Sequence, residues 1–538
     1  MATAAGSGFW WNVLFSPPKG LFGSQKKIGR RLSRFIHRGL SGPSSPGEIE
    51  MSEGLTARRG HAGVSFRDPA GRVLLAGNRV LRFVAPSAAP TLKGFLKTEL
   101  AAEAVSNGTL VGTEFLDCAE TETLLNNFSL PSSRTFFESA VVVEHERISF
   151  RSYPFEWPPE MLFAAGALML DLAEKALSEN FSLKDATPYN VLFRGARPVF
   201  VDLLSFDLRE PGDPTWLPLN QFTRTILLPL LANKYFGLRL DQVLTANRDG
   251  LEQSDIMQFC GVFRRFYPPF FGMVFLPWWL GRKPRDGDES IYQPRRLDDV
   301  QKARFILEQQ LKRLRRQLKT VEPLPKDSGW SDYMAPDKFF SQQYLQAKEK
   351  FVRRAMDEFK PDSVLDVGCN TGHFSEMAAR SGATVVAIDQ DPVVAGAVWR
   401  RAQAENLEIL PLVVNLARPT PAIGWRNEEC PSFLDRMRGC FDSVMMLAVL
   451  HHMLVTEQIP LWSILELASE LTSSLLIIEY VSPEDPMFRR IVRGREELFQ
   501  ELSEKTFEET VENWFEVVRA EQLNQTRRLY LLRKRSRV

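Results

Sequence analysis

The feature that most constrains the fold is an alternation of short apolar strands and helices that begins after Pro361. Strand patterns occur at 363–367, 384–388, 409–415, 441–447 and 474–480, and helical patterns at 372–381, 392–405 and 462–471. Because such alternation builds a parallel sheet covered by helices, we predict an α/β domain with a mostly parallel sheet over residues 336–538.

The loop after the first of these strands indicates a ligand site. Its sequence, VLDVGCNTGHFS at 364–375, joins an apolar strand to a helix through small residues that let a ligand approach the backbone closely. Asp389 ends the second strand 21 residues after Gly368, where a carboxylate can accept hydrogen bonds from a ribose. A nicotinamide or flavin site needs G-x-G-x-x-G, and this pattern fails at Asn370 and His373.

The loop instead matches Asp-x-Gly-x-Gly-x-Gly, with an asparagine in place of the middle glycine. Asparagine adopts left-handed backbone angles more readily than most residues. The motif resembles that of the class I S-adenosylmethionine-dependent methyltransferases, which implies a Rossmann-like fold and S-adenosyl-L-methionine as cofactor. By this resemblance the cofactor-binding residues are Asp366, Gly368, Asn370, Gly372, Asp389 and Asn415.

Longer blocks narrow the resemblance. FDSVMMLAVLHHM at 441–453, EYVSPEDPMF at 479–488 and RRLYLLRK at 527–534 are similar to a two-part bacterial group of methyltransferases related to nodulation proteins of the NoeA type. The similarity extends into the N-terminal half, through SLKDATPYNVLFRGARPVFVDLLSF.

The segment after the fourth strand supplies the candidate catalytic residues. Ligands of open α/β sheets bind beyond the carboxyl ends of the strands, which places residues 448–452 and Glu479 on the rim of the site. His451 or His452 is the candidate general base, because imidazole titrates near neutral pH. The alternative is that these histidines pack or cap a turn. On a strand the two side chains would point to opposite faces, and we expect no metal there.

The N-terminal half carries a second spacing pattern. Asp185 and Asn190 lie five residues apart, and Asp202 follows 12 residues later. Protein-kinase-like folds place a catalytic-loop Asp and two metal ligands at similar spacing after a helix, here predicted at 160–178. No glycine-rich loop or phosphate-binding lysine is evident. We therefore predict an α+β, kinase-like accessory domain over 64–300 whose nucleotide site is a relict, with coincidental loop residues as the alternative.

Local patterns within this half predict two further elements. A hairpin is expected around Gly77-Asn78, and one helix is expected from Thr91 to Ser106. The uncharged run at 267–281 is broken by prolines, and it is expected either to form a buried wall or to touch a membrane interface.

Two basic segments lie outside these domains. Residues 1–63 have no acid before Glu48 and are expected to be a disordered extension, with an organelle transit segment or a peripheral membrane binder as alternatives. Residues 301–335 are predicted to be a basic helix, at 301–321, and a linker. The polar face of this helix suits solvent, or else RNA, phosphate or anionic lipid. Its predicted apolar stripe consists of Phe305, Leu307, Leu311, Leu314 and Leu318.

Composition excludes several classes of protein. The 67 Lys and Arg residues nearly balance the 66 Asp and Glu residues, which excludes disorder throughout and a uniformly basic nucleic-acid coat. No apolar run reaches the roughly 18 residues of a membrane span. The five cysteines are scattered, which favours a reducing, cytoplasmic location.

These observations predict an S-adenosylmethionine-dependent methyltransferase that acts on a small-molecule or glycan-type acceptor. The absence of an N-P-P-Y-type amide-methylating signature after the fourth strand favours an oxygen, a carbon or a small-molecule nitrogen as the acceptor atom. An RNA methyltransferase that uses the helix at 301–321 is the first alternative. A non-catalytic scaffold with a relict cofactor site is the second.

Overall fold

The structure is a computed structural model that describes residues 67–127, 140–281, 296–328 and 341–536. The extension predicted at 1–63 lies outside the described residues, as does 329–335 of the predicted linker. The contacts separate Met1–Ala57 from Arg58–Val538. Both predicted domains belong to the second unit, and the boundary between them stays a prediction.

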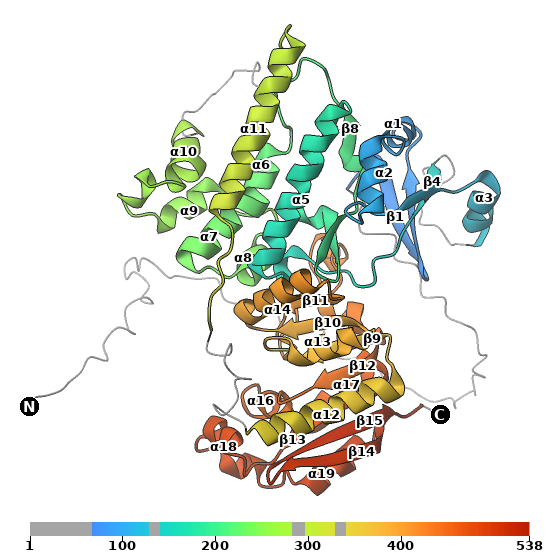
Figure 1. Ribbon diagram of the computed structural model, residues 1–538, viewed down its shortest axis with the longest axis vertical. Helices are drawn as coiled ribbons and strands as arrows, with labels where there is room; N and C mark the ends of the chain where they lie inside the picture. Colours follow the sequence, from blue (N-terminus) through green and yellow to red (C-terminus); the bar gives the residue numbers. More distant parts are fainter. Residues whose placement is uncertain (1–66, 128–139, 282–295, 329–340, 537–538) are drawn as a thin grey trace, which may run out of the picture. The chain divides into compact units, whose positions relative to one another are not determined.

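A seven-stranded sheet, drawn in orange to red in Figure 1, forms the centre of the C-terminal part. Its strand order is β11-β10-β9-β12-β13-β15-β14, and β15 is antiparallel to both of its neighbours. The mostly parallel α/β fold predicted for this part is confirmed. The strands are β9 (Ser363–Val367), β10 (Thr384–Asp389), β11 (Ile409–Val413), β12 (Phe441–Met446), β13 (Thr472–Val481), β14 (Phe515–Asn524) and β15 (Arg527–Lys534).

Helices cover both faces of the sheet at β9, β10 and β11, which explains why these strands are nearly continuous apolar runs. In β9, Val364 packs in one core cluster with α12 (Gln342–Phe359), α13 (His373–Arg380) and α14 (Pro392–Glu405). Leu365 and Val367 point into the other cluster. That cluster includes side chains of α15 (Phe433–Met437), α16 (Leu450–Val455), α17 (Leu461–Leu471), α18 (Pro486–Val492) and α19 (Glu504–Val511).

The N-terminal part begins with a four-stranded antiparallel sheet in the order β1-β2-β4-β3. The predicted hairpin is confirmed, and Gly77 turns the chain with a φ of 59°. The single helix predicted at 91–106 is wrong, because Thr98 interrupts it in an extended conformation and accepts a hydrogen bond from the backbone of Ala101. These elements are β1 (Gly71–Ala76), β2 (Arg79–Val84), α1 (Ala89–Phe95), α2 (Glu99–Ser106), β3 (Thr113–Phe115), α3 (Cys118–Asn127) and β4 (Val141–His145).

Helices dominate the rest of the N-terminal part. The helix predicted at 160–178 is α5 (Pro159–Ser178), and the basic helix predicted at 301–321 is α11 (Val300–Thr320). Gly166 lets α5 pack closely, because a Cβ there would lie 2.8 Å from Ile226. The other elements are β5 (Phe181–Leu183), β6 (Val191–Arg194), β7 (Arg197–Phe200), β8 (Phe206–Leu208), α6 (Leu219–Phe222), α7 (Leu228–Phe236), α8 (Leu240–Ala246), α9 (Gln253–Phe259) and α10 (Leu276–Gly281).

The apolar stripe of α11 differs from the prediction at one residue. Leu307, Leu311, Leu314 and Leu318 are buried, but Phe305 is 60% exposed. Ala303 takes the buried position one turn before Leu307, since residues four apart share a helix face and residues two apart do not. No helix among the described residues is both long enough and apolar enough to cross a membrane.

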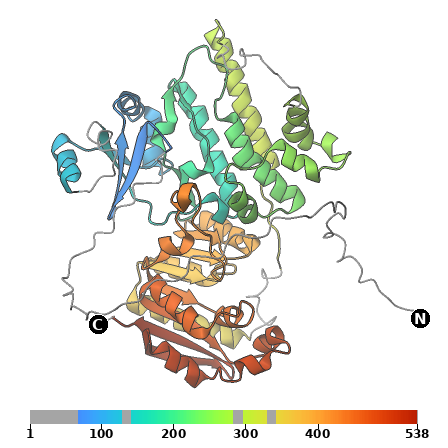
Figure 2. The same cartoon turned by 180° about the vertical axis from the view of Figure 1, so that it is seen from behind.

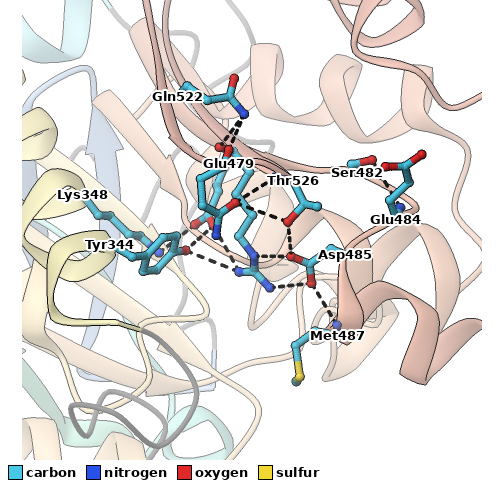
Figure 3. Close-up of polar contacts among 11 residues, drawn as sticks. Tyr344, Lys348, Glu479, Ser482, Glu484, Asp485, Met487, Gln522 and Thr526 are labelled. Carbon is cyan, nitrogen blue, oxygen red and sulfur yellow. Dashed lines mark hydrogen bonds and ion pairs between the residues drawn. The ribbon is translucent and has the colours of Figure 1, made fainter.

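A buried ionic network holds α12 against the sheet (Figure 3). The Glu479 carboxylate of β13 accepts hydrogen bonds from Lys348 Nζ at 2.7 Å, from Arg527 Nη1 at 3.2 Å and from the Tyr344 hydroxyl. Arg527, from β15, also donates to Asp485 at 2.8 and 3.0 Å. Burial alone would raise the pKa of Glu479, but Lys348 and Arg527 lower it to about 2.

We expect Glu479→Ala to destabilise the protein by about 3–5 kcal/mol, because Lys348 loses its buried counter-ion. The free energy of unfolding, measured by denaturant titration, checks this. The matched control is Glu509→Ala, which removes an exposed ion pair with Lys505 and should cost less than about 1 kcal/mol.

The pH dependence of this loss follows from the lowered pKa of Glu479. Its stabilising contribution is fully present above the unfolded pKa of 4.5 and is lost as the pH falls toward the folded value of about 2. The gap between wild type and Glu479→Ala should therefore narrow below about pH 4.5. A gap of constant size would contradict an ionic origin.

Candidate functional site

The loop after β9 lies where the strand order reverses direction, between β9 and β12. Such switch points are where open α/β sheets bind ligands. The backbone N–H groups of Gly368 and Cys369 donate to the Ile388 carbonyl at 2.8 and 3.0 Å, which ties the loop to β10. Gly368, Asn370 and Gly372 have φ values of 69°, 49° and 81°. Glycine and asparagine therefore occupy the positions where the backbone needs left-handed angles.

Close packing also requires both glycines. A Cβ at Gly368 would lie 2.5 Å from Val449, and one at Gly372 would lie 2.8 Å from Val398. The contact with Val449 brings the segment after β12 against the loop after β9. The loop after β9 and the segment after β12, which are about 80 residues apart in the sequence, thus meet at one edge of the sheet.

Asp366 is buried beneath this loop. Its Oδ2 accepts a hydrogen bond from Ser375 Oγ at 2.6 Å. Burial raises the pKa of Asp366 to about 6, while the Ser375 hydrogen bond and the positive charge of Lys348 oppose the rise. The carboxylate fixes the start of α13 to the end of β9.

Asp389 ends β10 beside the same loop. Its Oδ2 accepts from the backbone N–H of Asn370 at 3.0 Å, and its Oδ1 accepts from that of Asp391 at 3.0 Å. Burial raises the pKa of Asp389, and these backbone hydrogen bonds oppose the rise. Each carboxylate oxygen has a second lone pair, so the side chain can still accept hydrogen bonds from ligand hydroxyls.

Asn415 lies two residues beyond the end of β11, which is shorter than predicted. Its Nδ2 donates to Gln390 Oε1 at 3.1 Å, and its Oδ1 accepts from the backbone N–H of Ala417 at 2.9 Å. Asn415 therefore lies next to the loop after β10, on the same edge of the sheet as Asp389.

The two candidate histidines lie on α16, in the segment after the fourth strand, so the argument that strand neighbours point to opposite faces does not apply to them. Ala448, with a φ of 57°, turns the chain from β12 toward this helix. His451 is 1% exposed, and neither of its ring nitrogens has a hydrogen-bond partner among the described residues. Burial, with contributions from His452 and Arg527, lowers its pKa to about 3. His451 is therefore neutral at pH 7 and a weak base.

His452 is the more accessible of the pair. Its side chain is partly buried, and burial lowers its pKa. The two rings lie 4.3 Å apart between centroids. A general-base role for either histidine stays a prediction, and the burial of His451 favours His452.

The sequence patterns missed the ionic network beside the site. Lys348 Nζ lies 5.2 Å from the Phe374 ring centroid, so the network reaches the first turn of α13. Its positive charge also opposes the rise in the pKa of Asp366 that burial causes. The available signal was a single charge within the apolar run LLIIEYV, at Glu479. Helix α12, which supplies the partners Tyr344 and Lys348, precedes the first predicted strand, and the alternation of strands and helices did not predict it.

A second candidate site lies in the N-terminal part. Asp185, Asn190 and Asp202 line one cavity of about 1340 Å³. Asp202 accepts from Ser205 Oγ at 2.5 Å and forms an ion pair with Arg82 of β2. Asn190 Nδ2 donates to Ser205 Oγ at 3.2 Å. The structure therefore brings the three predicted residues together.

The charges around this cavity differ from those of a simple acidic metal site. Burial and then the nearby Asp202 raise the pKa of Asp185. Burial would also raise the pKa of Asp202, but Arg82 and Ser205 outweigh this and lower it. Lys184 lines the same cavity, so cations are present where no phosphate-binding lysine was evident in the sequence. The kinase-like interpretation stays a prediction.

The cavity also has walls from the C-terminal part, including Arg436 and Cys440. Arg436 forms a buried ion pair with Glu156. This pair fixes one part of the cavity wall with groups that are almost fully buried, at 3% and 0% exposure for the Arg436 and Glu156 side chains.

Comparison with known proteins agrees with this geometry. A family described as "Methyltransferase domain" matches residues 339–509. The chain is 29% identical to nodulation protein NoeA from Rhizobium meliloti (strain 1021) over 458 residues, which are 84% of this chain and 91% of that protein.

Two solved structures are also similar. The N-methyltransferase NodS from Bradyrhizobium japonicum WM9, in complex with S-adenosyl-L-homocysteine, is 14% identical, with a TM-score of 0.28 over 38% of this chain and 97% of that chain. The magnesium protoporphyrin IX methyltransferase ChlM from Synechocystis PCC 6803, with bound SAM, is 18% identical, with a TM-score of 0.27 over 38% of this chain and 90% of that chain. The residues that match the methyltransferase-domain family include the loop after β9 and Asp389.

Proposed function

We propose that the protein transfers a methyl group from S-adenosylmethionine to an acceptor. One observation carries the proposal: the left-handed loop from Gly368 to Gly372 is hydrogen-bonded to Asp389 at the switch point of a parallel sheet. This arrangement offers backbone groups, a helix start and a carboxylate to one ligand. The match to the methyltransferase-domain family covers these residues.

The residues of the site fit this cofactor. Asp389 accepts hydrogen bonds from the ribose hydroxyls, and the loop presents its backbone. Asp366 holds α13 in place through Ser375. When bound, the cofactor supplies an electrophilic methyl carbon, so the protein mainly orients the acceptor for in-line attack. His452 removes a proton from the acceptor where the acceptor is protonated.

The acceptor is a small molecule or a glycan-type molecule. The segment after β12 reads LAVLHHM and carries no N-P-P-Y-type signature. The name of the nodulation-protein relative is compatible with a specialised acceptor. The RNA alternative has less support, because Arg315 on the basic face of α11 is paired with Asp171 and Glu174 at 2.6 and 2.8 Å. The scaffold alternative gives no reason for the left-handed loop and its hydrogen bond to Asp389.

The N-terminal part acts as an accessory domain that selects or presents the acceptor. Its relict nucleotide site serves as scaffold, because Asp202 is already committed to Arg82 and Ser205. We place the protein in the cytoplasm, since all five cysteines are unpaired in the described residues, as expected in a reducing compartment.

Asp389→Ala should weaken S-adenosylmethionine binding by about tenfold to a hundredfold, because hydrogen bonds to charged groups contribute about 1.5–3 kcal/mol. Titration calorimetry measures the affinity. Asp389→Asn, which keeps one acceptor oxygen, should lose less. The control is Asp362→Ala, an exposed carboxylate at the opposite end of β9. Unchanged affinity in both Asp389 variants would place the cofactor elsewhere.

The acceptor can be found by comparing metabolites and glycans from a deletion strain with those of the parent strain. We expect one compound to lose the mass of a single methyl group, and complementation with the wild-type gene to restore it. Complementation with Asp389→Ala should restore little or none. If bulk tRNA or rRNA lost the methyl group instead, the RNA alternative would replace the small-molecule or glycan acceptor.

For the N-terminal cavity, we expect magnesium and ATP together to leave the Tm of the wild-type protein unchanged. The reason is that the Asp202 carboxylate is already bound to Arg82 by an ion pair and to Ser205 by a hydrogen bond. Magnesium alone and ATP alone serve as controls in the same thermal-shift measurement. A magnesium-dependent rise in Tm that disappears in Asp202→Asn but persists in Asp207→Asn, outside this cavity, would make the site a working one.

A further inference from the structure

The N-terminal part carries a concentrated set of exposed large apolar side chains between α9 and the end of α10. We call this set the aromatic surface; its members are between 41% and 92% exposed. Folded monomers expose scattered apolar residues, but they rarely gather so many large ones in one place. The aromatic surface consists of Phe263, Phe266, Tyr267, Phe271, Trp279 and Leu280.

Two rings of the aromatic surface pack against a further aromatic side chain, Phe275. Phe275 lies at its centre, with ring centroids 5.4 Å from Phe266, 6.0 Å from Phe271 and 6.2 Å from Trp278. Phe270, which neighbours Phe271 in the chain, points the other way and packs 5.2 Å from Tyr235 in the core. Phe266 and Phe271 are therefore held by a neighbouring ring, and docking these two side chains costs little conformational entropy.

The charged side chains around the aromatic surface are positive. From Ile256 to Gly281 the chain has no acidic residue, and its two charged residues are Arg264 and Arg265. The Arg264 guanidinium lies 5.1 Å from the Phe236 ring centroid, which anchors the base of the surface. Arg313 of α11 reaches the Gly272 carbonyl at 3.4 Å, so the basic helix runs alongside.

The arginines on the two sides of α11 differ in their neighbours. Arg315 faces α5 and is neutralised by Asp171 and Glu174. Arg313 faces the aromatic surface, and the exposed Phe305 and Ile306 lie two turns earlier on the helix. Aromatic and cationic side chains therefore continue from one element to the next. Figures 1 and 2 both show α9 and α10 beside α11.

We infer that the aromatic surface binds the interface of an anionic lipid bilayer. Aromatic rings with adjacent arginines suit the headgroup level, where the rings enter the acyl boundary and the cations meet lipid phosphates. A nucleic acid would demand more cations than Arg264, Arg265 and Arg313 provide. A membrane contact of this kind lies on the surface of the bilayer and needs no spanning helix. The inference is independent of the proposed methyl transfer.

The test is co-sedimentation of the full-length protein with vesicles of phosphatidylcholine alone or of phosphatidylcholine mixed with phosphatidylglycerol. We expect binding to the mixed vesicles that weakens as salt is added. The double variant Phe263→Ser/Trp279→Ser should bind at least about tenfold more weakly. The matched control Trp462→Ser/Leu498→Ser alters exposed apolar residues of the C-terminal part and should bind like wild type.

Two further measurements keep the test decisive. Arg313→Gln should weaken binding to the mixed vesicles and leave the weaker binding to phosphatidylcholine unchanged. If the double variant has a lower Tm than wild type, Phe263→Ser alone replaces it, because Phe263 is 92% exposed.

Three outcomes would overturn the inference. The first is no binding of the wild-type protein to either kind of vesicle. The second is equal binding by wild type and the double variant, which would assign membrane contact to another part of the chain, such as residues 1–57. The third is absence of vesicle binding together with a wild-type dimer that becomes a monomer in the double variant, which would make a second copy the occupant.

Discussion

The C-terminal part depends on one buried interaction, the pairing of Glu479 with Lys348 and Arg527. Removing these charges from water costs several kcal/mol each, and only their mutual contacts offset that cost. The pairing joins α12, which lies before the first strand, to β13 and to the antiparallel strand β15. Asp485, at the start of α18, completes the charge balance of Arg527. The network therefore joins α12 to three elements that lie more than 100 residues later in the chain.

The cofactor site inherits its geometry from this arrangement. Lys348 reaches the Phe374 ring on α13, and α13 is tied to β9 by the hydrogen bond between Ser375 and Asp366. The loop above them adopts left-handed angles that glycine and asparagine tolerate, and Asp389 bonds its backbone. A site built in this way is organised before any ligand binds, so binding energy is not spent on ordering the loop.

The N-terminal part has two features of interest, a cavity lined by acidic residues and a surface of exposed aromatic side chains. Asp185, Asn190 and Asp202 share a cavity, as their spacing suggested, yet Asp202 is paired with Arg82. The same part of the molecule presents exposed aromatic rings beside a basic helix.

The sequence by itself determined the α/β alternation, the positions of the loop and of Asp389, and the helices α5 and α11, because these depend on local periodicity and on residues that permit particular backbone angles. It did not predict β14, β15 or α12, nor the helical setting of His451 and His452. Only the tertiary structure decided that Glu479 lies in a buried ion pair and that Phe305 points outward. Burial and charge pairing depend on segments that folding brings together. The pattern of a single strand or helix does not specify which distant segment will pack against it.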